Sequence, residues 1–245
     1  MKKMLILAVE TSTRVGSIAL LEAPPEDQGL PQILGEVTLN VPATHSERLL
    51  PAIDRLLADA CLTVRQIQGI ALAIGPGSFT GLRIGVSTVK GLAFALGVPV
   101  VGVPTLDALA QNLRYAQGLV CPIIDARKKE VYAALFRADG RGRLTKESDD
   151  WVLAPEDLCA RIPEPVIFLG NGIEAYGEVL RERLASRALF APPEFSFPRA
   201  VHVGCLSIPR FYKGQTVDLF SFAPTYIRRS EAEIHQEEQV KAWGK

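Results

Sequence analysis

A glycine-rich turn between Gly75 and Gly81 holds the residues best suited to bind an anion. The turn, GPGSFTG, follows an apolar run and precedes a segment of helical period. Backbone N–H groups exposed at such a turn, at the start of a helix, suit a phosphate group. The segment 10–12, Glu-Thr-Ser, ends an earlier apolar run and is a candidate for the same site. No lysine follows Gly81, and Thr80 stands where G-x-G-x-x-G would end, so the motif favours a structural turn over a phosphate site.

The predicted helix after this turn is unusually rich in glycine. Each glycine inside a helix costs about 1 kcal/mol relative to alanine. Gly77, Gly81 and Gly85 recur every fourth residue, so they form one stripe without side chains. Such a stripe lets another backbone approach closely. Packing inside the domain and a contact between subunits both explain it at this point.

Two further positions could do chemistry but lack partners. His45 begins a predicted helix, where a histidine four residues later would complete a pair of metal ligands, but Leu49 stands there. No serine or cysteine lies in a nucleophile elbow or a cysteine-protease signature.

Asp125 is followed by Arg127 and Lys128, where a phosphate-binding turn would need glycine. Either the two basic side chains supply charge in place of backbone donors, or the phosphate site has degenerated, which is the interpretation we favour.

The elements that would position these residues occur twice, in the same order. In each half, apolar runs and helical periods predict three strands, a helix, a strand and another helix. In the first half we expect strands at 4–9, 15–21, 33–41, 70–74 and 98–103, and helices at 44–60 and 78–96. After a helix at 104–113, the second half has predicted strands at 120–124, 130–136, 151–153 and 166–169, and helices at 155–161 and 173–184. Thr44 and Glu47 predict a capping box on the first helix.

Composition excludes several classes of protein. The 245 residues carry 27 basic and 27 acidic side chains, and this balance lacks the basic excess of a protein that grips nucleic acid unaided. The four cysteines are widely spaced, with no metal-ligand pattern, and Cys61 and Cys121 are predicted core residues. No run approaches the roughly 18 apolar residues of a membrane span. We therefore expect a soluble protein of the cytoplasm with no membrane partner.

Two βββαβα halves resemble the α/β fold of the actin-like ATPases, the sugar kinase and Hsp70 type. We expect a first half at 1–104, which includes the dimerisation helices, a second half at 105–230 and a polar tail at 231–245. The resemblance implies that a nucleotide lies in the cleft between the halves. It also implies that the acidic residues that end the first strand of each half, Glu10 and Asp125, hold its metal.

Four segments resemble one bacterial family more closely. LAVETSTRVGSIALL, HSERLLPAIDRLL, GPGSFTGLRIGVSTVKGLAFALGVPVVGV and PIIDARKKEVYAALF are similar to the TsaB family, also called YeaZ. The resemblance implies a non-catalytic paralogue of TsaD that binds TsaD and, with the ATPase TsaE, makes N6-threonylcarbamoyladenosine in ANN-decoding tRNAs. It implies tRNA contact only through that complex. His45 falls where the first metal histidine of TsaD would be, and Leu49 replaces the second.

The resemblance also implies that self-association and pairing with TsaD use the helices 44–60 and 78–96. We interpret the glycine stripe accordingly, as an approach surface for the helices of another subunit. The predicted interface consists of His45, Leu49, Leu50, Ile53, Leu57, Gly77, Phe79, Gly81, Leu82, Gly85, Val86 and Val89.

The glycine turn then remains as the remnant of an ancestral phosphate loop. A vestigial nucleotide cleft would consist of Glu10, Thr11, Ser12, Gly75, Gly77, Asp125, Arg127, Gly170 and Gly172. No cofactor is firmly implied, although ATP or ADP at the interface of the complex stays open. The alternative hypothesis is an ATPase or kinase-like enzyme that uses Glu10 and Asp125 on magnesium. A metallopeptidase is disfavoured because Leu49 removes a ligand.

Overall fold

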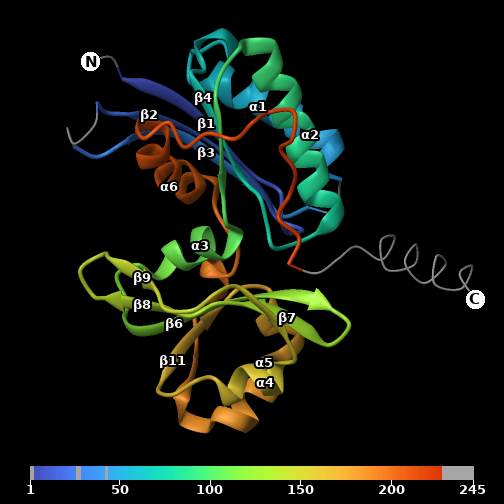
Figure 1. The fold of residues 1–245 in the computed structure, drawn as a ribbon, viewed down its shortest axis with the longest axis vertical. Coiled ribbons are helices and arrows are strands. Elements are labelled where there is room, and N and C mark those ends of the chain that lie inside the picture. Colours follow the sequence, from blue (N-terminus) through green and yellow to red (C-terminus); the bar gives the residue numbers. More distant parts are fainter. Residues whose placement is uncertain (1–2, 26–28, 42–43, 228–245) are drawn as a thin grey trace, which may run out of the picture.

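The computed structural model describes residues 3–25, 29–41 and 44–227, which form two α/β halves, one above the other in Figure 1. The predicted polar tail at 231–245 lies outside the described residues. Each half is built on a sheet whose central strands are buried on both faces, as the continuous apolar runs predict.

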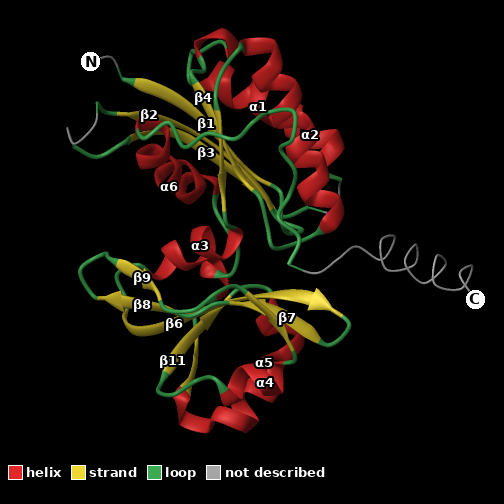
Figure 2. Cartoon of the chain, viewed as in Figure 1, coloured by secondary structure: helices red, strands yellow, loops and turns green. Residues whose placement is uncertain are grey.

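The first half holds a five-stranded sheet in the order β3-β2-β1-β4-β5. β1 pairs antiparallel with β2 and parallel with β4. Helices α1 and α2 pack on one face, and α6 packs on the other (Figure 2). The bounds are β1 Met4–Glu10, β2 Gly16–Ala23, β3 Gln32–Leu39, α1 His45–Asp59, β4 Gly69–Ala73, α2 Phe79–Leu96, β5 Val100–Val103 and α6 Ala200–Tyr212, with a short 3-10 turn at Val64–Gln66.

The second half repeats this strand order as β10-β7-β6-β11-β12, and a hairpin of β8 and β9 extends its seven-stranded sheet beside β6. α4 and α5 pack on one face of the sheet. The bounds are α3 Thr105–Ala110, β6 Gln117–Arg127, β7 Glu130–Ala133, β8 Phe136–Asp139, β9 Leu144–Lys146, β10 Trp151–Leu153, α4 Pro155–Ala160, β11 Val166–Leu169, α5 Gly172–Leu184 and β12 Ala188–Phe190, with 3-10 turns at Gln111–Leu113, Ala185–Arg187 and Pro193–Phe195.

The equivalent order of the two sheets confirms the predicted repeat, and the fold is that of the actin-like ATPases. The repeat extends to backbone conformation at the turns after β4 and β11. Gly75 has φ of 112° and Gly170 has φ of 113°. L-residues rarely adopt this region, so glycine serves both turns. The backbone also requires it at Gly170, where a Cβ atom would lie 2.1 Å from the carbonyl oxygen of Ile123.

The two halves exchange their last helices. α3 follows β5 of the first half but contacts β6 of the second, while α6 follows β12 of the second half and packs on β1, β2, β4 and β5 of the first. The sequence predicts that residues 105–230 all belong to the second half. The structure differs at α6, which packs on the sheet of the first half. The reason is apolar complementarity, because Val201 and Val203 of α6 cover Ile6, Ala8 and Leu21 of the first sheet.

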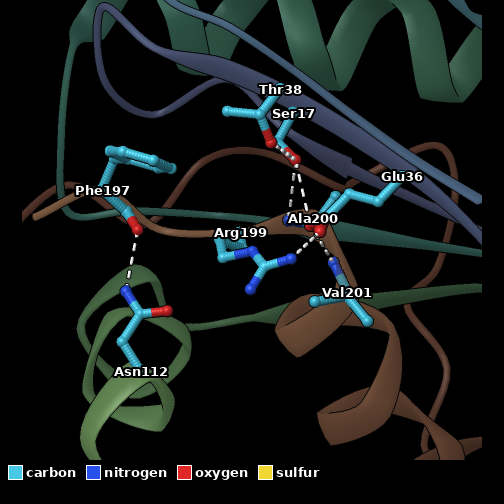
Figure 3. A network of polar contacts seen from close by, with 8 residues as sticks. All are labelled: Ser17, Glu36, Thr38, Asn112, Phe197, Arg199, Ala200 and Val201. Atoms are coloured by element: carbon cyan, nitrogen blue, oxygen red, sulfur yellow. Dashed lines mark hydrogen bonds and ion pairs between the residues drawn. The ribbon is translucent and has the colours of Figure 1, made fainter. Parts of the chain in front are cut away.

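Figure 3 shows how α6 is fixed to its sheet. The carboxylate of Glu36 in β3 accepts a hydrogen bond from the backbone N–H of Val201 at 3.1 Å and pairs with Arg199. The hydroxyl of Ser17 in β2 accepts from the N–H of Ala200, also at 3.1 Å. Two N–H groups in the first turn of α6, which no residue of the helix itself could satisfy, therefore bond to the sheet.

Asn112 secures the segment that leads into α6. Its side-chain amide donates to the carbonyl oxygens of Phe195 and Phe197, both at 2.9 Å, and the second bond is drawn in Figure 3. Asn112 lies in the 3-10 turn that follows α3. Its two hydrogen bonds therefore tie the chain crossing after α3 to the segment that leads into α6.

Two local predictions need correction. Thr44 precedes α1, but its side chain makes no capping bond to the helix backbone, and its hydroxyl lies instead 2.9 Å from that of Ser46. Cys61 is exposed at the end of α1, whereas Cys121 is buried as expected. Among the described residues, α2 is the one helix whose length and composition would allow it to span a membrane. Its side chains of Leu82, Val86 and Val89 pack against the first sheet.

Candidate cleft between the two halves

A cleft of about 830 Å³ opens between the two halves. The first half lines it with the β1–β2 loop, the glycine turn and the start of α2, and the second half with the β6–β7 turn. The residues that line it are Ser12, Thr13, Arg14, Thr44, His45, Gly77, Ser78, Phe79, Thr80, Gly81, Ile84, Ile124, Asp125, Ala126, Arg127, Lys128, Tyr132, Asn171 and Tyr226.

The glycine stripe of α2 lies against the β1–β2 loop of the same chain. A Cβ atom at Gly77 would lie 2.2 Å from the carbonyl oxygen of Ser12, and one at Gly81 would lie 2.0 Å from that of Thr11. At Gly85 it would lie 2.3 Å from the hydroxyl of Thr11. Real atoms do not approach so closely. The predicted role of the stripe as an approach surface for another subunit is therefore wrong, because the backbone it admits is its own.

Glu10 lies behind this loop and has no exposed surface. One carboxylate oxygen accepts a hydrogen bond from the backbone N–H of Ser12, and the other has no partner among the described residues. Burial raises the pKa of Glu10 from 4.5 to about 7, and the Ser12 hydrogen bonds oppose that shift. The carboxylate does not line the 830 Å³ cleft, so a metal ion in the cleft would not meet it.

Asp125 lines the cleft, but its carboxylate is engaged within the second half. It accepts from the backbone N–H of Arg127 at 2.8 Å and from the hydroxyl of Tyr176 at 3.3 Å. The guanidinium of Arg127 lies 3.2 Å away. Burial first, and then the charge of Asp125, raise the pKa of Tyr176, which keeps that hydroxyl a donor. Three contacts thus hold the carboxylate that a magnesium ion would need.

His45 connects α1 to the β1–β2 loop. Its Nε2 atom lies 2.7 Å from the carbonyl oxygen of Thr13. Leu49, one turn later, is buried in the core of the first half and faces no second ligand. The described residues contain no group of three metal-ligating side chains. His45 therefore positions the loop that forms one wall of the cleft.

The cleft brings together four of the predicted vestigial residues, namely Ser12, Gly77, Asp125 and Arg127. The remaining five lie behind it or beside it and do not line it. These are Glu10, Thr11, Gly75, Gly170 and Gly172.

Most of the predicted interface residues are covered by their own chain. Leu50 is 51% exposed, whereas His45 and Phe79 are partly buried. A partner gains little contact from a side chain whose surface its own chain already covers, so the buried positions are corrected to core residues. They are Leu49, Ile53, Leu57, Gly81, Leu82, Gly85, Val86 and Val89.

Sequence reasoning missed a strap formed by residues 215–227, which runs along α2 (Figure 1). Lys90 donates to the carbonyl oxygens of Phe220 and Phe222 at 3.0 and 3.2 Å. Near the cleft, the ring of Tyr226 lies 5.0 Å from that of Phe79, whose face carries the guanidinium of Arg83 at 3.9 Å. The sequence signal for the strap was PTYI at 224–227, because it includes Tyr226, whose ring contacts Phe79.

Comparisons with known proteins agree with this architecture. The sequence model of the TsaD family, tRNA N6-adenosine threonylcarbamoyltransferase, matches residues 32–236. The chain is 32% identical to the tRNA threonylcarbamoyladenosine biosynthesis protein TsaB of Bacillus subtilis, over 97% of this chain and 100% of that protein. It is 31% identical to TsaB of Escherichia coli, over 94% and 96%.

Solved structures give the same result. YeaZ from Pseudomonas aeruginosa is 31% identical and superposes with a TM-score of 0.73, over 91% of this chain and 100% of that one. A structure described as an uncharacterized protein with similarity to peptidase YEAZ, from the same organism, gives 0.74 at 31% identity, over 92% and 100%. The chain belongs to the TsaB family of tRNA threonylcarbamoyladenosine biosynthesis proteins.

Proposed function

We propose that this chain is a non-catalytic subunit that binds a TsaD-type threonylcarbamoyltransferase in the cytoplasm. With the ATPase TsaE, this assembly modifies ANN-decoding tRNAs. The observation that carries the proposal is the state of the two acidic residues. Glu10 is closed off behind the β1–β2 loop, and Asp125 is held by Arg127 and Tyr176. A magnesium-dependent kinase would need both carboxylates free to meet the metal.

A surface for TsaD, or for a second copy of this chain, is available on α1 and α2. Leu50 of α1 is 51% exposed and Phe94 of α2 is 72% exposed. The two helices pack side by side on the same face of the sheet. Exposed apolar side chains on adjacent helices favour a helix-to-helix interface. A self-complementary patch of this kind lets a homodimer compete with the TsaD heterodimer.

Charge substitution on this surface tests the proposal. Leu50→Glu and Phe94→Glu should each weaken capture of TsaD at least about tenfold, since a charge would be desolvated in the interface. Binding of the purified full-length chains can be measured by biolayer interferometry. Leu189→Glu is the matched control, because Leu189 is also 51% exposed but lies in the second half. An equal loss in the control, or no loss in either α-helix variant, would contradict the proposed surface.

Turnover separates the scaffold from the alternative enzyme. The isolated chain should show no magnesium-dependent ATP hydrolysis. The mixture with TsaD, TsaE, tRNA and threonylcarbamoyl adenylate as the donor should form threonylcarbamoyladenosine in the tRNA and release AMP. Hydrolysis by the isolated chain that disappears in Glu10→Ala would refute the non-catalytic role and support the kinase-like alternative.

A further inference from the structure

Two covalent crossings of the chain join the halves, and they are fixed to each other. The first runs from β5 into α3, and the second runs from β12 into α6. The side-chain amide of Asn112, in the turn after α3, donates to the carbonyl oxygens of Phe195 and Phe197 in the second crossing. α3 and α6 also pack on each other. The two crossings would therefore act together as a single hinge if the cleft opened.

The strap at 215–227 is anchored to the first half along most of its length. The backbone N–H of Val217 donates to the carbonyl oxygen of Val100 in β5 at 2.9 Å. Phe222 is 8% exposed and belongs to the core of the first half. Lys90 of α2 adds its two hydrogen bonds to carbonyl oxygens of the strap. The body of the strap therefore moves with the first half.

The end of the strap lies on the glycine turn, beside the cleft. The N–H of Thr225 donates to the carbonyl oxygen of Ile74 at 2.8 Å, directly after β4. A Cβ atom at Gly75 would lie 2.7 Å from the carbonyl oxygen of Thr225. The hydroxyl of Tyr226 accepts a hydrogen bond from Arg83 of α2 at 3.2 Å. These contacts leave the end of the strap little freedom relative to the first half.

Ile227, the next residue, contacts the other half. Its side chain is partly buried against the apolar cluster of α3 and the second sheet, which contains Ile124, Ala126 and Tyr132. These three residues line the cleft, and so does Tyr226. Figure 1 shows the strap running along α2 toward the second half. The strap thus bridges the two halves at the cleft, where no covalent crossing joins them.

The attachment of the strap distinguishes this contact from simple filling of a gap. An isoleucine that only filled a gap in the second half would need no fixed residues before it. Here Thr225 and Tyr226 are bound to the first half, so the first half presents Ile227 to the second. Separation of the halves must withdraw that side chain from its apolar contacts, which costs free energy in proportion to the apolar area returned to water.

We propose that the strap is a latch that holds the two halves closed over the cleft. The crossings at α3 and α6 form the hinge, and the contact of Ile227 breaks when the cleft opens. The attached strap keeps the cleft at about 830 Å³, and its release widens the cleft and exposes both walls. No partner is needed for this latch, since every contact it uses lies within the chain.

Distances between spin labels on the two halves test the latch. The labels are attached at Ser87→Cys in α2 and Lys129→Cys in the β6–β7 turn, which are both exposed positions. The full-length chain also carries Cys61→Ser and Cys205→Ala, because these native cysteines are not buried. Pulsed electron paramagnetic resonance should give one narrow distance distribution when the strap is intact. Ile227→Ala should add a population at longer distance and raise the ratio of open to closed molecules at least about fivefold.

A second variant releases the strap from its other side. Tyr226→Ala removes the ring contact with Phe79 and the hydrogen bond from Arg83, so it should also increase the open population. Phe220→Ala is the matched control, because it truncates an aromatic side chain of the same strap that is 83% exposed. Its distance distribution should equal that of the chain with the intact strap.

Three results would overturn the latch. The first is a broad distribution that already includes long distances when the strap is intact. The second is an unchanged distribution in Ile227→Ala or in Tyr226→Ala, and the third is an equal opening in the Phe220→Ala control. Ile227 and Tyr226 are only partly buried, so both variants should fold, which far-UV circular dichroism verifies.

Discussion

Glu10 shows how a single residue can retain its position while its environment changes what it can do. Its place at the end of β1 follows from the apolar run before it, and the sequence predicts that correctly. What sequence cannot supply is solvent access. In the fold the carboxylate has no exposed surface, and one of its oxygens has no partner among the described residues.

This burial makes stability depend on pH. Because the folded-state pKa of Glu10 is raised to about 7 from 4.5, the folded chain holds its proton more tightly than the unfolded chain. Stability from this residue is therefore fully present below pH 4.5 and is lost as the pH rises through 7. Glu10→Gln should remove the loss, so the variant should gain about 3 kcal/mol over wild type between pH 5 and pH 8.

Urea unfolding of both proteins across this pH range measures the difference. Glu47→Gln, which removes an exposed carboxylate from α1, controls for the change in net charge. A gain in Glu10→Gln that is the same at every pH would show that the carboxylate is not titrating in the folded chain.

At the scale of elements, periodicity located most helices and strands, because each buries one apolar face. The elements it missed, β8, β9, β12 and α6, are short or interrupted. β12 has three residues, and α6 contains Pro209. The spacing of Gly77, Gly81 and Gly85 predicted a stripe without side chains. Spacing alone could not predict which backbone would pack against that stripe. The β1–β2 loop lies far away in sequence and arrives there only through the parallel pairing of β1 with β4.

Glycine substitutions along α2 separate packing from helix propensity. Gly81→Ala should lower the free energy of unfolding by about 1–3 kcal/mol, since the new methyl group would overlap the carbonyl oxygen of Thr11. Gly91→Ala, on the same helix, meets nothing within 4 Å and should stabilise by up to about 1 kcal/mol. Chemical denaturation of the two variants checks both signs. Equal stabilisation by both would mean that the loop does not press on α2.

At the scale of the molecule, the halves are not independent units. Their strand orders repeat, which the sequence order of elements predicted, but the exchange of α3 and α6 could not be read from local patterns. The exchange depends on which sheet has an apolar face that no helix of its own half covers. In the first half that face carries Ile6, Ala8 and Leu21, and its cover is α6.

A fragment that ends at residue 104 should therefore fail to fold, because it leaves the α6 face of its sheet in water. Joining residues 198–227 to it through a flexible linker should restore a monomer with cooperative thermal unfolding. Circular dichroism and size-exclusion chromatography report both properties. If the shorter fragment alone were monomeric and cooperative, α6 would be an accessory to the first half and no part of its core.

The late position of α6 in the sequence also determines when the first half can finish folding during synthesis on the ribosome. β1 emerges first, yet the helix that completes its sheet lies at Ala200–Tyr212. Nascent chains generally fold their leading domain while the rest is being made. Here the leading sheet must wait with one apolar face open until most of the chain has left the exit tunnel, so the first half is begun first but finished last.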